Sequence, residues 1–254
     1  AIRDPLWSRG LGDVYKRQHY ARLAFSDHGI RLLKAADRNK DQSYFLQSVS
    51  AAQLEGVMFP LGELTKPEVR LIAKEQGLGT YDKKDSTGIC FIGERRFKDF
   101  LQDYLPAQPG VIEDDMGRVI GKHAGLMYHT LGQRQGLGIG GVKGASEEPW
   151  YVIDKDLARN VLVVAQGNQH PKMQSSSLIC KQIDWIGEEP TLPFHGSAKV
   201  RYRQADQQCQ LVREADFYRV SFKAPQRAVT PGQWACFYAE DWCLGGGVID
   251  EHFA

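Results

Sequence analysis

Short alternating segments fill the last third of the chain, residues 166–254, and this pattern restricts the possible fold more than any other feature. The segments are short and turn residues separate each from the next, and Ala198–Arg203 and Tyr218–Lys223 alternate apolar and polar residues. Such alternation indicates strands that bury one face, so we expect an all-β domain here. The segments are Ala198–Arg203, Tyr218–Lys223, Trp234–Tyr238 and Gly247–Ile249.

In the segment Ala198–Arg203, every second residue is basic. As one continuous strand it would place Lys199, Arg201 and Arg203 in a row on one face. Such a row could contact phosphate groups. An ordinary solvated strand face has the same composition, and the residues alone favour that simpler interpretation.

Residues 19–100 have α/β character. The strongest helix pattern is Thr65–Gly77, in which Thr65 and Glu68 form a capping box and Gly77 suits the position after the last turn. We expect this helix to have one apolar face. A short strand is predicted at Gly29–Leu33 and a second helix from about Glu94.

Residues 101–165 contain a glycine-rich run, G-L-G-I-G-G at Gly136–Gly141, that formally satisfies a dinucleotide-binding pattern. That pattern requires a strand before it and a helix after it. Here a polar, turn-like stretch, Lys143–Glu148, follows, and then a predicted strand at Trp150–Ile153. We therefore interpret the glycines as a tight, exposed loop near a partner.

Cys90 lies between a small-residue turn and an apolar pair, with basic residues on both sides. Nearby positive charge favours the thiolate, which is the form that acts as a nucleophile or sulfur carrier. A buried structural cysteine is the alternative, and spacing alone favours it, because a free cysteine packs like a small apolar residue. The basic neighbours are Lys83, Lys84, Arg95 and Arg96.

The composition sets broad limits on function. At 254 residues the chain can form two or three small domains. Its net charge of +1 does not by itself indicate an RNA-binding protein. No apolar stretch approaches the ~18 residues of a membrane span, so we expect no membrane association. The five cysteines show neither disulfide nor metal spacing, which suits a reducing cytoplasm and predicts no metal site.

Long, ordered motifs run from residue 19 to about residue 250. They are H-Y-A-R at His19–Arg22, N-K-D-Q-S-Y-F-L at Asn39–Leu46, F-P-L-G-E-L-T-K-P at Phe59–Pro67, K-K-D-S-T-G-I-C-F-I-G-E-R at Lys83–Arg95, Y-L-P-A-Q-P-G at Tyr104–Gly110, H-T-L-G-Q-R-Q-G-L-G-I-G-G at His129–Gly141, P-W-Y-V-I-D-K-D at Pro149–Asp156, R-Y-R at Arg201–Arg203, T-P-G-Q at Thr230–Gln233 and C-L-G-G-G at Cys243–Gly247. In these motifs the chain resembles the bacterial tRNA-specific 2-thiouridylases.

The resemblance implies three domains. Residues 19–100 would be the C-terminal part of an ATP-pyrophosphatase domain of the PP-loop, Rossmann-like α/β fold, supplying the later strands and helices of its parallel sheet. Residues 101–165 would be a small central α+β domain that binds tRNA. Residues 166–254 would be a C-terminal β-barrel.

The reaction that the resemblance implies is ATP-dependent 2-thiolation of the wobble uridine of tRNA. ATP, used with Mg²⁺, would adenylate O2 of the uridine. A persulfide on Cys90, loaded by an upstream sulfur-relay protein, would then supply the sulfur, and a transient disulfide with a second cysteine would complete the transfer. No cysteine precedes Cys90, and the family's S-G-G-x-D-S phosphate loop is not found in this chain.

The resemblance also assigns contacts with tRNA and one contact with ATP. Basic side chains can meet phosphate, amides and carboxylates can bond base or sugar edges, and an aromatic ring can hold an unstacked base. The tRNA contacts would be His19, Lys40, Asp41, Gln42, Arg201, Tyr202 and Gln233, and Gln18 takes the place of a family glycine near ATP.

Residues 1–18 do not resemble the family, and Asp13–Gln18 look like a translated sequencing adapter. We expect a non-native leader here, with a natural extension as the alternative. Two hypotheses follow: the gene product is a tRNA sulfurtransferase, or the chain as given keeps tRNA and sulfur-carrier surfaces without catalysis. A stand-alone redox protein would lack a nearby resolving cysteine. We also expect a partial α/β domain to expose sheet edges and to favour aggregation.

Overall fold

The computed structural model describes residues 19–26, 29–79, 81–82, 106–142 and 144–254. These residues form two compact units. The larger unit comprises the described part of Ala1–Lys83 with Ser177–Ala224 and Pro231–Glu251. The smaller unit comprises the described part of Lys84–Ser176 with Pro225–Thr230 and His252–Ala254.

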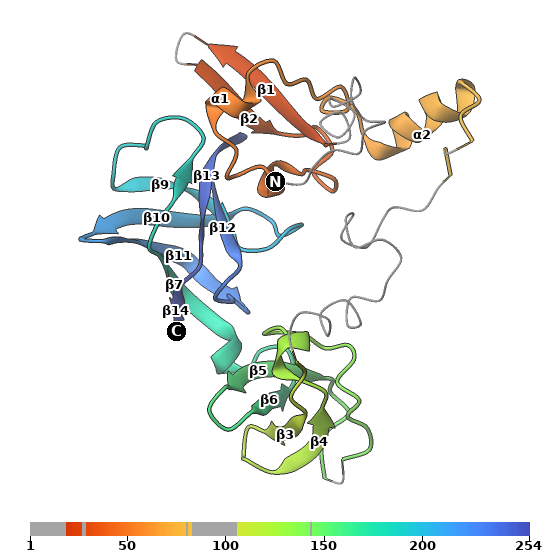
Figure 1. Ribbon diagram of the computed structural model, residues 1–254, viewed down its shortest axis with the longest axis vertical. Helices are drawn as coiled ribbons and strands as arrows, with labels where there is room; N and C mark the ends of the chain where they lie inside the picture. Colours follow the sequence, from red (N-terminus) through yellow and green to blue (C-terminus); the bar gives the residue numbers. More distant parts are fainter. Residues whose placement is uncertain (1–18, 27–28, 80, 83–105, 143) are drawn as a thin grey trace. The chain divides into compact units, whose positions relative to one another are not determined.

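A ten-stranded sheet organises the larger unit (Figure 1). Its strands are β1 (Ala21–Ser26), β2 (Gly29–Lys34), β7 (Gln174–Cys180), β8 (Asp184–Trp185), β9 (Phe194–Lys199), β10 (Gln207–Glu214), β11 (Phe217–Arg227), β12 (Trp234–Ala239), β13 (Trp242–Val248) and β14 (Glu251–Phe253). Their order is β1-β2-β13-β12-β9-β10-β11-β7-β14, and β8 pairs with β13. Three predicted strands are confirmed, because they lie within β2, β11 and β12.

The hairpin β1–β2 joins the C-terminal strands. β1 and β2 are antiparallel, and β2 pairs antiparallel with β13 through Leu33 opposite Trp242 and Leu32 opposite Cys243. The expectation that residues 19–100 supply strands of a parallel sheet is therefore wrong for the two described strands of this segment. Only two residues separate β1 from β2, and a parallel pairing needs a crossover of about a dozen residues.

Helices in the larger unit follow β2. They are the short 3-10 helix η4 (Ser43–Phe45), α1 (Ala51–Leu54) and α2 (Lys66–Glu75). The predicted capping box of α2 is confirmed, since Thr65 N–H donates to Glu68 Oε2 at 2.6 Å and Glu68 N–H donates to Thr65 Oγ1 at 3.5 Å. Gly77, with φ of 66°, follows the helix as predicted.

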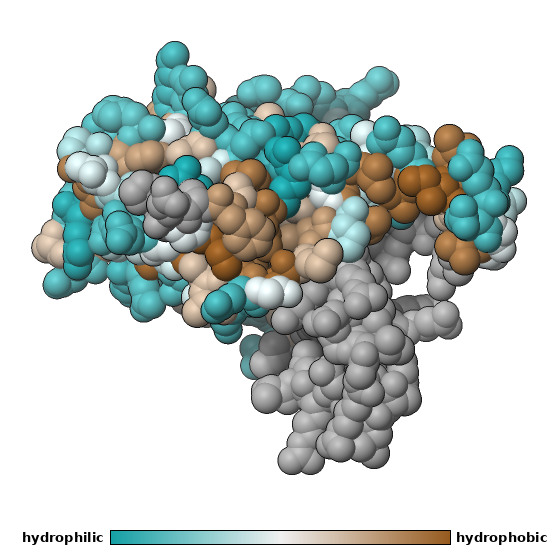
Figure 2. All heavy atoms as spheres, turned by 90° about the horizontal axis from the view of Figure 1, so that it is seen from above, coloured by the Kyte–Doolittle hydropathy of each residue, from teal (hydrophilic) through white to brown (hydrophobic). Residues whose placement is uncertain are grey.

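The apolar face of α2 is not buried. No residue of α2 is buried, and Leu71 and Ile72 are 56% and 45% exposed. At the right of Figure 2, apolar and hydrophilic residues both reach the surface over this helix. The helix therefore owes its stability to its caps more than to packing against the described residues.

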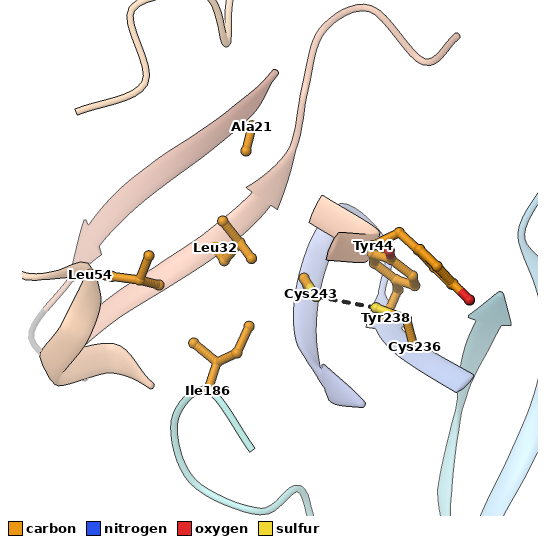
Figure 3. Packing of buried hydrophobic residues seen from close by; sticks show 8 residues of the cluster. All are labelled: Ala21, Leu32, Tyr44, Leu54, Ile186, Cys236, Tyr238 and Cys243. Carbon is orange, nitrogen blue, oxygen red and sulfur yellow. Dashed lines mark hydrogen bonds between the residues drawn. The ribbon is translucent and has the colours of Figure 1, made fainter. Parts of the chain in front are cut away.

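The core of the larger unit ties the hairpin and η4 to β12 and β13. Figure 3 shows how its side chains converge from these elements. This packing fixes the segment after β2 on the sheet, which is where the residues of the candidate site lie. The buried members are Ala21, Leu32, Tyr44, Leu54, Ile186, Cys236, Tyr238 and Cys243.

The smaller unit has a four-stranded sheet. Its strands are β3 (Gly110–Asp114), β4 (Val119–His123), β5 (Trp150–Asp156) and β6 (Val161–Gln166), with 3-10 helices η5 (Leu126–Tyr128) and η6 (Pro171–Met173). The order is β4-β3-β6-β5, and β3 with β6 is the parallel pair. The predicted strand at Trp150–Ile153 is confirmed as part of β5.

The glycine-rich run of the smaller unit forms a loop between η5 and β5. Gly136, Gly138 and Gly141 have positive φ values of 76°, 64° and 61°. No helix follows the run within the described residues, so it lacks the context of a dinucleotide-binding turn. Across both units, no described helix is long and apolar enough to cross a membrane.

Candidate nucleic-acid interface

The segment after β2 carries the K-D-Q motif, and Asp41 holds it in place. Asp41 Oδ1 accepts from the backbone N–H of Ala35 at 3.0 Å and of Ser43 at 3.2 Å. Asp41 Oδ2 accepts from the Ser43 hydroxyl at 2.9 Å. Asp41 is only 4% exposed, so its carboxylate shapes the segment from inside. Its direct contact with tRNA stays a prediction.

Gln42 connects the motif to the start of the described chain. Its Oε1 accepts from the backbone N–H of Tyr20 at 2.9 Å, and its own N–H donates to the Tyr20 carbonyl at 2.8 Å. This two-point contact places His19, the neighbour of Tyr20, beside the K-D-Q segment. His19, Lys40 and Gln42 are all half-buried.

A buried group of charges connects the same segment to β9 and to the residues just before β10 and β13. Lys34 Nζ donates to Asp206 Oδ2 and to the Glu240 carbonyl, each at 2.6 Å. Lys199 Nζ lies 3.5 Å from Asp41 Oδ2 and 3.6 Å from Asp206 Oδ1. Each buried ammonium therefore has a carboxylate partner, as buried charges require.

Tyr238 lies at the centre of this charge group. The ammonium groups of Lys34 and Lys199 lie 4.3 and 5.3 Å from its ring centroid, within the range of a cation–π interaction. Its hydroxyl is 3.2 Å from the Ser43 hydroxyl. Burial, reinforced by the neighbouring thiols, raises the pKa of Tyr238, so its hydroxyl stays protonated. Figure 3 shows Tyr238 close to Tyr44, with Cys236 and Cys243 beside them.

Tyr44 connects η4 to the start of β12. Its hydroxyl donates to the Trp234 carbonyl at 2.9 Å, and Trp234 directly follows Gln233. Burial raises the pKa of Tyr44 to about 12, Cys236 adds to this, and the nearby Arg201 opposes it. Residues from three predicted tRNA-contact motifs are therefore brought close to one tyrosine.

Three aromatic rings form what we call the aromatic cluster: Tyr44, Phe45 and Tyr202. The ring centroids of Phe45 and Tyr202 are 4.5 Å apart, and those of Tyr44 and Phe45 are 5.5 Å apart in an edge-on arrangement. Tyr44 and Tyr202 are 6.5 Å apart. The Arg203 guanidinium lies 5.5 Å from the Tyr202 ring centroid. Rings beside cations are the combination that holds unpaired bases and their phosphates.

The R-Y-R motif lies in a turn, which corrects one prediction. β9 ends at Lys199, and Arg203 has a φ of 66°, so Ala198–Arg203 is not a continuous strand. Lys199 is 9% exposed and faces the buried charges, so the predicted exposed row of three cations is wrong. The turn instead carries Arg201 and Tyr202 beside η4, and Arg203 is exposed.

Gln233 lies where the chain enters β12. Its carbonyl accepts from the Ile249 N–H at 2.8 Å, which fixes its backbone against the end of the sheet. Its side chain is half-buried. The predicted strand at Gly247–Ile249 is confirmed in part, because β13 begins earlier, at Trp242, and ends at Val248.

Two predicted site residues, Cys90 and Gln18, lie outside the described residues. The described cysteines, Cys180, Cys209, Cys236 and Cys243, are all free and buried. Cys236 and Cys243 have their sulfur atoms 3.5 Å apart. Burial raises the pKa of Cys180 and Cys209 to about 12 and that of Cys243 well above its usual value. The thiols of Cys180, Cys209 and Cys243 are therefore poor nucleophiles.

Among the described residues, no group of three or more His, Cys, Asp or Glu side chains could hold a metal ion. The candidate interface consists of polar, basic and aromatic side chains. Phe45 was not among the predicted site residues, although it lies inside the N-K-D-Q-S-Y-F-L motif, and Arg203 was predicted only as part of a row on a strand face. The available signal was an aromatic residue three positions after the K-D-Q motif.

Three family models match consecutive parts of the chain. A model described as tRNA methyl transferase HUP domain matches residues 10–94, and it starts inside the expected leader. A tRNA methyl transferase PRC-barrel domain matches residues 98–166, and an Aminomethyltransferase beta-barrel domain matches residues 175–249. The three models thus follow the expected order of an ATP-using α/β domain, a middle domain and a C-terminal barrel.

Several curated proteins of similar sequence carry the name tRNA-specific 2-thiouridylase MnmA. The protein of Stutzerimonas stutzeri (strain A1501) is 59% identical over 240 residues, which is 94% of this chain and 64% of that protein. The protein of Pseudomonas entomophila (strain L48) is 59% identical, and that of Pseudomonas fluorescens (strain SBW25) is 58% identical, with the same coverage. The chain therefore spans about 64% of the length of these relatives.

Proposed function

The chain belongs to the tRNA-specific 2-thiouridylase family, and we propose that it is part of an enzyme that replaces O2 of the wobble uridine of tRNA with sulfur. The observation that carries this proposal is the convergence of the K-D-Q segment, the R-Y-R turn and Gln233 on Tyr44. Motifs that are far apart in the sequence thereby approach one buried tyrosine of the larger unit, which supports their action as one tRNA-binding surface.

The contacts with tRNA divide by chemistry. We assign Tyr202 to a stacked, unpaired base, because its ring is half-buried and already braced by Phe45. Arg201 and Lys40 suit backbone phosphates, which position an RNA without reading its sequence. His19, Gln42 and Gln233 offer hydrogen bonds to sugar or base edges. Asp41 acts mainly by holding this segment in shape.

ATP would be needed to activate the uridine oxygen, and the match to a HUP domain supports its use. None of the described residues forms a glycine-rich turn that leads into a helix N-terminus, the usual cradle for phosphates. Accordingly, no ATP contact is assigned to them. The persulfide on Cys90, its sulfur donor and Mg²⁺ also remain parts of the proposal. A tRNA substrate would place the protein in the cytoplasm.

A second candidate function is tRNA binding without catalysis. The chain as given would bind tRNA through the surface described above and would not thiolate it. The proposed transfer needs a second reactive cysteine besides Cys90, and the poorly nucleophilic thiols of Cys180, Cys209 and Cys243 do not suit that role, which agrees with this alternative.

One experiment separates the two functions. The purified chain is incubated with unmodified tRNA, ATP, Mg²⁺ and glutathione persulfide, which can pass its outer sulfur to the Cys90 thiol and leave as glutathione, and thiolated tRNA is detected by its retardation in a mercury-containing gel. Binding to the same tRNA is measured in parallel. Retarded tRNA that is lost in Cys90→Ser supports the enzyme, whereas binding without retardation supports the binding fragment. Absence of tRNA binding contradicts both.

A further inference from the structure

Phe45 exposes about half of its surface although it belongs to a packed group of rings. Its neighbour Tyr44 is 9% exposed, whereas Phe45 is 51% exposed. An isolated exposed aromatic side chain is common and needs no explanation. Phe45 is not isolated, because its ring lies against Tyr202 and edge-on to Tyr44.

The charges around Phe45 indicate what kind of partner would cover it. Arg203 is exposed and lies over the ring of Tyr202. Arg201 is close enough to Tyr44 to lower its pKa against the effect of burial. A protein partner would cover an exposed ring best with apolar neighbours, whereas a nucleic acid supplies a flat base and an adjacent phosphate together. The basic rim of the aromatic cluster favours the nucleic acid.

We propose that Phe45 is a second stacking residue, which holds an unpaired tRNA base next to the base held by Tyr202. This inference rests on the proposed tRNA-binding function. It extends that function, because Phe45 is not among the residues that the family motifs assign to tRNA. The tilt of 41° between the two rings suits two bases that are unstacked from each other.

The experiment measures binding of the chain to an anticodon stem-loop RNA that carries the fluorescent base 2-aminopurine in its loop. The variants are Phe45→Leu and Phe45→Trp, with Tyr202→Leu as a reference for stacking. Phe25→Leu is the matched control, because Phe25 is also exposed, at 72%, and lies outside the aromatic cluster. Phe25 is near the turn of the β1–β2 hairpin, at the opposite end from Lys34. Thermal melts of each variant show whether it folds.

We expect Phe45→Leu to weaken binding about 5- to 100-fold, since stacking of a base on one ring contributes roughly that much. In Phe45→Leu, quenching of 2-aminopurine should fall, whereas the slope of log Kd against log salt concentration should stay unchanged. Phe45→Trp keeps an aromatic ring and should bind like the unaltered chain. Loss of a phosphate contact, as in Arg203→Gln, should instead reduce the salt slope by about one.

Three results overturn the inference. If Tyr202→Leu weakens binding but Phe45→Leu behaves like Phe25→Leu, Phe45 does not stack on RNA and the proposed function survives. If Phe45→Leu lowers the melting temperature and Phe45→Trp fails to restore binding, Phe45 packs against protein. If the unaltered chain does not bind the RNA, the proposed function itself fails, and the inference with it.

Discussion

Lys34 donates a 2.6 Å hydrogen bond to Asp206, and its side chain is 2% exposed. Lys34 ends β2, and Asp206 directly precedes β10, so one ion pair joins the N-terminal hairpin to a barrel strand. Lys199 bridges Asp206 to Asp41, which extends the connection to the K-D-Q segment. The stability of the sheet and the shape of the candidate interface therefore depend on the same charges.

Replacing Lys34 with Met should destabilise the larger unit by about 1–3 kcal/mol. Removal of one partner from a buried pair costs more than this when the other charge stays buried, but Asp206 is partly exposed and water can reach it. Urea unfolding measures the change. Lys223→Met is the control, because Lys223 is exposed and donates only a 3.4 Å bond to Gln208. Equal unfolding midpoints for the two variants would contradict the assigned role.

Replacing Asp41 with Asn should weaken RNA binding through loss of shape. An amide keeps only one acceptor oxygen, so it cannot accept both from the Ala35 and Ser43 N–H groups, as Oδ1 does, and from the Ser43 hydroxyl beside Lys199, as Oδ2 does. We expect a loss of about 1–3 kcal/mol in stability and a several-fold weaker Kd. Asp216→Asn, at an exposed position, should change neither quantity. Weaker binding without any loss of stability would indicate a direct contact with RNA instead.

The described cysteines should resist thiol reagents in the folded chain. With a pKa of about 12, only about one thiol in 10⁴ is ionised at pH 8 for Cys180 and Cys209. We expect one fast reaction with Ellman's reagent, at Cys90, and five reactive thiols after unfolding. Cys90→Ser should abolish the fast phase. A fast phase that persists in this variant would show that a buried thiol becomes accessible in the native state.

Asp114 should stabilise the smaller unit at neutral pH. Burial alone would raise its pKa, but hydrogen bonds from the backbone and side chain of Arg118 and from the Met116 N–H lower it overall. The pKa of Asp114 is lower in the folded chain than in the unfolded chain, where it is about 3.9. The charged carboxylate therefore stabilises the fold above pH ~3.9, and this stabilisation is lost as the pH falls through the pKa of the folded state.

Asp114→Asn should therefore lower the urea midpoint at pH 7 and have a much smaller effect near pH 2. The midpoint is followed at the amide resonances of β3, which report on the smaller unit. Glu147→Gln, at an exposed position in the same unit, should show no such dependence. An equal decrease of the urea midpoint at both pH values would mean that the charge of Asp114 does not contribute to the stability of the smaller unit.

Local sequence signals predicted the local structure well. The capping box at Thr65 and Glu68 and the positive φ of Gly77 follow from side-chain chemistry within one helix. The pairing of Leu33 with Trp242 could not be predicted in this way, because the two residues lie roughly 200 positions apart and many strands could pair with β2. Strand pairing depends on tertiary contacts that a local pattern does not contain.

The candidate site was predicted by resemblance more than by pattern. Alternation alone placed Lys199 on an exposed face, whereas two carboxylates, Asp41 and Asp206, hold it inside. The same pattern extended the strand through Arg203, where the backbone in fact turns. Phe45 was not predicted as a site residue, because a single sequence does not distinguish an exposed aromatic residue from a buried one.

The most direct test of the account is the affinity of the chain for an anticodon stem-loop RNA with and without the Tyr202 ring. We predict that the chain prefers the stem-loop to a duplex of the same length, and that Tyr202→Leu weakens binding about 5- to 100-fold. Tyr81→Leu, at a residue 40% exposed and outside the aromatic cluster, should bind like the unaltered chain. Equal affinities for Tyr202→Leu and the unaltered chain, or equal binding of stem-loop and duplex, would contradict the account.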